Sequence, residues 1–206
     1  MRHQGWLAAA VGGAILALTG CGGTPAPSVL SGRACLSRLA AEEVSYRPVD
    51  SPEASDSRCH VDTAVRVSRI EAALSRPATM SCAMASRLDE FDREVVQPLA
   101  KEDLGSRVTR IDHLGSFACR ASTGRPSRLS QHALGQAIDI AGFRLSDGSR
   151  VSVERDWSDS SAKGVFLHRL ASKACRYFSV VLTPDSNADH YNHLHVDIGT
   201  EHFCGI

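Results

Sequence analysis

The sequence has no surplus of charge of either sign. It carries 23 lysine and arginine residues against 23 aspartate and glutamate residues. Domains that bind nucleic acid usually show a clear excess of positive charge, so this balance gives no reason to expect nucleic acid as a partner. No Gly-rich phosphate loop is present either.

Two further patterns are missing. The sequence has no G-x-S-x-G motif and no C-x-x-C pair. The first absence, together with cysteines that look paired, argues against a serine or cysteine hydrolase. The second argues against a structural zinc site built on cysteines.

The one long apolar run is too short to span a bilayer. It extends from Trp6 to Leu18, roughly 13 residues, whereas a membrane-spanning helix needs about 20. The run fits the core of a signal peptide and ends in Leu18-Thr19-Gly20-Cys21, which resembles the bacterial lipobox. We therefore predict that residues 1–20 are a lipoprotein signal peptide and that Cys21 carries the lipid. The alternative is an ordinary signal peptide that is cleaved near Gly20, with no lipid.

The segment after Cys21 is rich in Gly, Pro, Ser and Thr. We predict that residues 21–33 are a flexible tether and that residues 34–206 form one domain, since no linker or repeat follows. Gly22 is not the aspartate that often retains lipoproteins in the inner membrane. The predicted location is the outer membrane, facing the periplasm, in a Gram-negative host, and otherwise the membrane at the cell surface.

Six cysteines remain once Cys21 is assigned to lipid. An even number in an exported chain indicates disulfides, here three. The sequence alone does not choose among the possible pairings. Our prediction joins neighbours along the chain: Cys35–Cys59, Cys82–Cys119 and Cys175–Cys204.

Hydrophobic periodicity divides residues 34–206 into helices and strands. The predicted helices are Ala34–Val44, a helix capped by Ser81 that ends near Val96 before Pro98, and Ser160–Tyr177. The predicted strands are Val61–Ile70, Arg107–Leu114, Phe178–Leu182, His193–Ile198 and a hairpin over Ala137–Ser152 that turns at Asp147-Gly148. This order predicts an α+β fold with an antiparallel sheet and flanking helices.

Two of the predicted strands carry ligand-type residues on one face. In residues 137–141 two isoleucines face one way and Asp139 the other, and in residues 193–197 the apolar Leu194 and Val196 alternate with His193, His195 and Asp197. Side by side, the strands would place an apolar face on the core and a polar face in a cleft.

His132 lies just before the first of these strands, and Gly135 lets the chain turn so that His132 and Asp139 can point at one ion. Two histidines and an aspartate leave a fourth tetrahedral position open, which is the layout of a catalytic zinc. Taken alone, an H-x-H pair is more often two half-exposed strand residues. The combination of His132, Asp139 and His195 favours zinc.

The pattern S-x-H-x-x-G-x-A-x-D over residues 130–139, followed by H-x-H at 193–195, resembles the zinc D-Ala-D-Ala peptidase group. That group includes VanY-type carboxypeptidases, lysostaphin-type and murein endopeptidases, and the hedgehog signalling domain. The segments 119–120, 128–133, 137–143 and 187–197 are similar to the bacterial extensin-like C-terminal domain family, over about residues 34–204. The resemblance implies a hedgehog/D-Ala-D-Ala-peptidase-like fold and zinc ligands at His132, Asp139 and His195.

The resemblance also implies catalytic residues. VanY-like enzymes use a glutamate, shortly before a Trp-His pair, to accept the proton of the zinc-activated water. This chain has no glutamate there. Its His190-x-x-His193-x-His195 resembles the penicillin-insensitive murein endopeptidase. His193 is our first choice for the base or transition-state stabiliser, and His190 the second.

A carboxylate-bearing substrate needs a cation or hydrogen-bond donor in the cleft. Arg128, Arg120 and Ser130 are the candidates for binding substrate. The alternative interpretation is that the two arginines are ordinary surface charges and that Ser130 only caps the turn that holds His132. Asp197 either orients a histidine or is an exposed acid at the strand end. The remaining histidines have no matching partner in the sequence and are expected to be structural or exposed: His60, His113, His168 and His202.

The sequence therefore predicts a lipid-anchored zinc metallopeptidase that cuts peptide stems or cross-links of peptidoglycan. The second interpretation is a non-catalytic zinc-containing module that binds cell wall or a protein, as the hedgehog domain does within that group. A structural domain without metal is the third.

Overall fold

The computed structural model describes Met1, residues 32–123 and residues 125–206. The predicted signal peptide, the lipid attachment at Cys21 and the tether as far as Ser31 lie outside the described part of the chain. None of the described helices is both long enough and apolar enough to cross a membrane.

A mostly antiparallel sheet of nine strands forms the centre of the fold. The strands run in the order β1-β2-β3-β4-β7-β10-β9-β11, and β8 pairs with β7 outside this path. Among the described strands, only β3 with β4 and β9 with β11 pair in parallel. The nine strands are β1 (Ser45–Pro48), β2 (Ala64–Arg69), β3 (Ala73–Ser81), β4 (Val108–Gly115), β7 (Ala137–Leu145), β8 (Arg150–Ser152), β9 (Val180–Leu182), β10 (Leu194–Asp197) and β11 (Phe203–Gly205). The short strands β5 (Ala121–Ser122) and β6 (Arg125–Leu129) form a separate hairpin.

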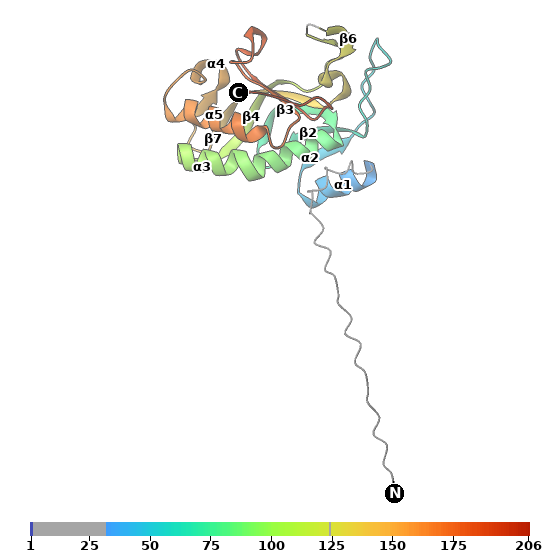
Figure 1. The fold of residues 1–206 in the computed structure, drawn as a ribbon, viewed down its shortest axis with the longest axis horizontal. Coiled ribbons are helices and arrows are strands. Elements are labelled where there is room, and N and C mark those ends of the chain that lie inside the picture. The colour runs from blue at the N-terminus through green and yellow to red at the C-terminus, as the bar shows by residue number, and fades with distance from the viewer. Residues whose placement is uncertain (2–31, 124) are drawn as a thin grey trace.

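Three helices lie together on one side of this sheet, α2 (Cys82–Phe91), α3 (Gln97–Leu104) and α5 (Ala162–Ala174) (Figure 1). Their apolar residues and those of the sheet form one hydrophobic core. The helix α1 (Gly32–Ala41) packs on α2, and the short α4 (Val153–Asp156) follows β8. The predicted α+β class with flanking helices is confirmed.

The helix that begins after Ser81 is longer than predicted. Ser81 does cap it, because its hydroxyl accepts a hydrogen bond from the backbone N–H of Met84 at 3.2 Å. The predicted end at Pro98 is wrong, since a π-helical segment, η1 (Asp92–Val96), leads into α3 and the chain stays helical to Leu104. Pro98 lies in the first turn of α3, where a proline is tolerated.

The sequence prediction missed three strands of the sheet, β1, β3 and β11. The strand β3 contains exposed Arg76 and Pro77, which break the apolar alternation that identifies a half-buried strand. The residues of β11 are largely exposed and give no alternation either. The strand predicted over residues 61–70 is confirmed in its centre as β2.

Three disulfides are present, but two of the predicted pairings are wrong. The bonds join Cys35 to Cys82, Cys59 to Cys119 and Cys175 to Cys204. Only the last follows the order along the chain. Cys35 lies on α1 and Cys82 begins α2, so the packing of these two helices brings together cysteines that are distant in sequence.

Candidate metal centre

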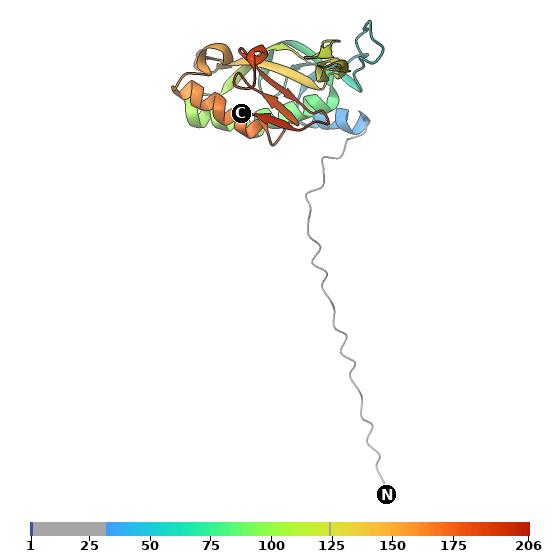
Figure 2. The ribbon, with the colours of Figure 1, turned by 45° about the horizontal axis from the view of Figure 1, so that its top comes forward.

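The adjacent strands β7 and β10 place Asp139 and His195 side by side. The strands pair antiparallel, and His195 lies directly opposite Asp139 in the register. Their neighbours along each strand belong to the core, so both ligand-type side chains point away from it. Figure 2 shows the last strands of the chain, in red, beside the yellow strand β7.

A short 3-10 helix, η2 (Gln131–Leu134), presents His132 to the same point. Ser130 caps it, because the Ser130 hydroxyl accepts a hydrogen bond from the backbone N–H of His132 at 3.3 Å. Gly135 ends η2 with φ = 62°, in the left-handed region. A Cβ at this position would lie 2.7 Å from a methyl group of Val61, so only glycine fits both the conformation and the space.

Three ligand atoms converge there. Nε2 of His132 lies 3.1 Å from Oδ1 of Asp139 and 3.1 Å from Nδ1 of His195, and the last two atoms are 3.0 Å apart. His132 and His195 are buried, and Asp139 is half-buried. Together the three residues could hold one metal ion.

Hydrogen bonds on the far side of each ring fix which nitrogen faces this point. Nδ1 of His132 lies 3.1 Å from the carbonyl oxygen of Ser116, and Nε2 of His195 lies 3.1 Å from Oδ2 of Asp197. A carbonyl and a carboxylate only accept, so the proton of each neutral ring is on that outer nitrogen. Two nitrogen lone pairs and a carboxylate oxygen are then left facing one another. This donor set suits zinc, and the outer hydrogen bonds are those that orient zinc ligands.

The carboxylates of Asp139 and Asp197 also attract positive charge to this point, so a proton competes with a metal ion for it. Burial alone would raise the pKa of Asp139, but the hydrogen bonds that His132 and His195 donate when their inner nitrogens carry protons outweigh it and hold that pKa well below its usual range. Burial alone would lower the pKa of His195, yet its bonds to Asp139 and Asp197 raise it to about 9. The pocket therefore favours positive charge at its centre.

A comparison with protein-family models matches residues 33–205 to the family described as Extensin-like protein C-terminus. The chain belongs to this extensin-like family. The match covers all the residues of the metal centre and all three disulfides. No curated protein and no solved structure matches the chain.

In this extensin-like domain, His193 and His190 stand beside the centre. Nε2 of His193 lies 3.5 Å from Oδ1 of Asp139, and the rings of His190 and His193 are 5.0 Å apart between centroids. Burial lowers the pKa of His193, and burial together with the neighbouring His193 lowers the pKa of His190 to about 4. Both rings are therefore neutral near pH 7 and able to accept a proton.

Of the three candidates for binding substrate, two are engaged in other contacts. Ser130 caps η2, and Arg128 forms an ion pair with Glu201, which also binds Arg125 at 2.8 Å. Arg120 lies close enough to His193 for its charge to lower the pKa of that ring. Its backbone carbonyl accepts a hydrogen bond from the N–H of Ser130 at 3.1 Å, which ties Arg120 to the start of η2.

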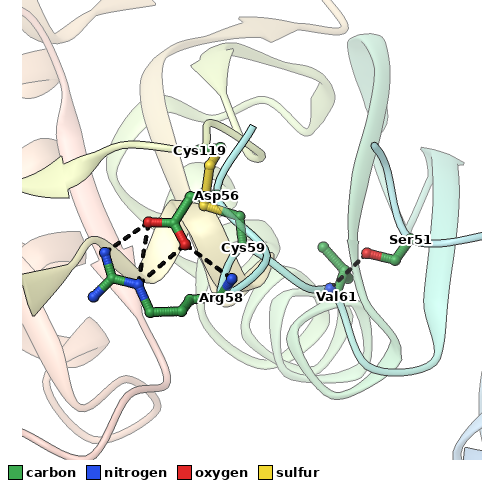
Figure 3. The surroundings of a disulfide bond; sticks show 6 residues. All are labelled: Ser51, Asp56, Arg58, Cys59, Val61 and Cys119. Carbon is green, nitrogen blue, oxygen red and sulfur yellow. Dashed lines mark hydrogen bonds and ion pairs between the residues drawn. A yellow bond between two sulfur atoms is a disulfide. The ribbon is translucent and has the colours of Figure 1, made fainter. Parts of the chain in front are cut away.

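A disulfide holds the segment that supports His132. A disulfide joins Cys119 to Cys59 (Figure 3). The loop that contains Cys59 also carries an ion pair between Asp56 and Arg58 at 2.6 Å. The bonded segment 116–120 contains the Ser116 carbonyl, and the N–H of Ala118 donates to the carbonyl of His132 at 3.2 Å. The sequence prediction missed Ser116, because a backbone carbonyl leaves no mark in the sequence.

The other histidines do not join the centre. His60 is exposed beside Asp62, and His202 is exposed. His113 is buried with Nε2 at 2.9 Å from the carbonyl of Arg76, and His168 stacks on Trp157. These placements agree with the structural or exposed roles that the sequence predicts for them.

Proposed function

We propose that the extensin-like domain is a zinc metallopeptidase that acts on the peptide stems or cross-links of peptidoglycan, held at a membrane by lipid on Cys21. The observation that carries the proposal is the geometry around His132, Asp139 and His195. One nitrogen of each histidine ring and one carboxylate oxygen lie about 3 Å from one another, and a hydrogen bond at the other nitrogen of each ring fixes its orientation.

When bound, zinc would lower the pKa of a water molecule and polarise the carbonyl of the bond to be cut. The residues of the chain supply the rest. Neutral His193 could take the proton of the attacking water at Nε2 and return it to the leaving amine. Arg120 could pair with a carboxylate of the bound peptide. His190, whose ring lies 5.0 Å from that of His193 between centroids, is the second candidate for this base.

The choice of peptidoglycan rests on three supports. The motif of residues 130–139 with the H-x-H at 193–195 resembles zinc D-Ala-D-Ala peptidases, including VanY-like enzymes and the penicillin-insensitive murein endopeptidase. The predicted export signal and lipobox would place the domain outside the cytoplasm, facing the cell wall. The three disulfides fit an oxidising compartment.

A second candidate is a zinc-containing module that binds cell wall or a protein without cutting it. The observation in its favour is that the segment before His195 holds His190 and His193 and no glutamate, whereas VanY-like enzymes use a glutamate in this region. The two candidates share the metal centre and differ only in chemistry.

Digestion of purified sacculi separates them. The zinc-loaded protein is incubated with sacculi, and released muropeptides are identified by mass spectrometry. New products that disappear in His193→Ala support the peptidase, whereas binding to sacculi without products supports the module. A His202→Ala variant, altered at an exposed histidine, should match the wild type. If the zinc-loaded protein neither cuts nor binds sacculi, both candidates are wrong.

A further inference from the structure

Three arginines stand in one row across neighbouring strands. In the register of the sheet, Arg110 of β4 lies opposite Arg144 of β7, and Arg144 lies opposite Arg150 of β8. Like charges directly opposite each other destabilise a sheet. The row is therefore not explained by the stability of the sheet.

One carboxylate serves all three side chains. Asp112 lies 2.9 Å from Arg110, 3.2 Å from Arg150 and 3.6 Å from Arg144. A carboxylate accepts about four hydrogen bonds, while three guanidinium groups offer about 15 N–H donors. The cluster keeps a surplus of two positive charges and many free donors, and each arginine side chain is between a third and a half exposed.

The row faces the same side of the sheet as the metal centre. On β7, Asp139 lies between the core residues Ile138 and Ile140, and Arg144 lies between the core residues Phe143 and Leu145, so both polar side chains point away from the core. They share a face although they are five positions apart, because the register of β7 with β4 shifts by one residue between Gly142 and Ile140. Arg144 comes five positions after Asp139, which is roughly 16 Å along a strand. An extended peptide of about five residues covers that distance.

We propose that Arg110, Arg144 and Arg150 form a subsite that binds a carboxylate of the peptide substrate, about four to five residues from the bond at the metal centre. This inference rests on the proposed peptidase function for the identity of its ligand. Arginine fits the role because its planar fork binds a carboxylate through two parallel hydrogen bonds. Asp112 holds the three guanidinium groups in place, and the N–H donors that do not face Asp112 are available to the ligand.

The test measures binding rather than cleavage. The probe is a fluorescently labelled peptidoglycan stem peptide with free carboxylates, and its affinity is read by fluorescence anisotropy. Binding is measured in the full chain carrying His132→Ala and His195→Ala, which removes the metal ligands. The binding result does not depend on cleavage. The arginine subsite can therefore be confirmed even if the protein does not cut sacculi, and it can be refuted even if the protein does.

The double substitution Arg144→Gln with Arg150→Gln should weaken binding about tenfold, since two charged contacts are lost together. It leaves the pair between Arg110 and Asp112 intact. Arg169→Gln is the matched control: this arginine is also partly exposed and pairs with Glu102 and Asp103 on the helical side.

Three results would overturn the subsite. The double substitution could leave the affinity unchanged, although circular dichroism shows a native fold. The amidated form of the peptide could bind as tightly as the free acid. Inorganic phosphate could compete as well as the peptide does, which would identify an unspecific anion patch.

Discussion

Asp197 accepts a hydrogen bond at 3.1 Å from Nε2 of His195, the ring nitrogen opposite the one that faces Asp139. The two residues are neighbours on one face of β10 and both are buried. The other oxygen of Asp197 accepts from the backbone N–H of Gly199 at 2.8 Å. Asp197 thus links the ring of His195 to the loop that follows the strand.

Asp197→Asn should weaken zinc binding by about 10–100-fold, because the amide nitrogen cannot accept the proton of His195 and the ring loses its fixed tautomer. The remaining oxygen can still accept from Gly199, so the loop should keep its place. Zinc affinity is measured by competition with a chromophoric chelator. Asp185→Asn, at an exposed aspartate, is the control and should bind zinc as the wild type does.

The purified protein should hold about one zinc ion per chain, since three ligands converge on one point. His132→Ala and His195→Ala should each abolish binding that survives dialysis. Elemental analysis after dialysis measures both. Zinc retained at full occupancy by the double variant would place the metal elsewhere.

His193→Ala should leave zinc affinity within a few-fold of wild type while activity on sacculi is lost. The reason is that His193 approaches Asp139 at 3.5 Å but has Nδ1 bonded to Asn192 at 2.8 Å, outside the group of three converging ligands. Parallel measurements of zinc content and product release separate the two effects. Equal losses of metal and activity would show that His193 is a ligand instead.

The disulfide between Cys59 and Cys119 should matter for metal binding as well as for stability. Replacing both cysteines by serine frees the segment that carries the Ser116 carbonyl, so the His132 ring loses its fixed partner. Replacing Cys175 and Cys204 is the control, because that bond joins the end of α5 to β11. Chain entropy predicts a loss of roughly 4 kcal/mol of unfolding free energy in each pair.

Only the Cys59–Cys119 pair should also lose zinc affinity. Urea unfolding gives the stabilities, and chelator competition gives the affinities. A similar loss of zinc affinity in both double variants would indicate a general loosening of the fold.

The sequence predicted which side chains converge because their signal is local. Alternation along two short strands and one motif around Gly135 were enough to predict that His132, Asp139 and His195 face one point. The pairing of Cys35 with Cys82 depends on how α1 packs on α2, which no local pattern encodes. The strand β3 was missed for a similar reason: Pro77 and Arg76 interrupt its alternation, and its pairing with β2 and β4 makes it a strand.

Asp92 in the π-helical segment should make the folded state sensitive to pH. It is fully buried, and its carboxylate accepts from the N–H of Ala72 at 2.7 Å and from the amide of Gln97 at 2.9 Å. Burial outweighs these bonds and raises the pKa of Asp92 to about 6. The native state therefore holds this proton more tightly than the unfolded chain does.

The stabilisation from this proton is fully present below the ordinary aspartate pKa, near ~4, and is lost as the pH rises through about 6. A shift of this size is worth at most roughly 3 kcal/mol. Urea unfolding at pH 4.5 and pH 7.5 should show a smaller pH dependence for Asp92→Asn than for the wild type. Asp62→Asn, at an aspartate whose side chain is 90% exposed, is the control and should keep the wild-type dependence. If the unfolding free energy changed by the same amount between the two pH values in the wild type and in Asp92→Asn, Asp92 would not titrate in this range.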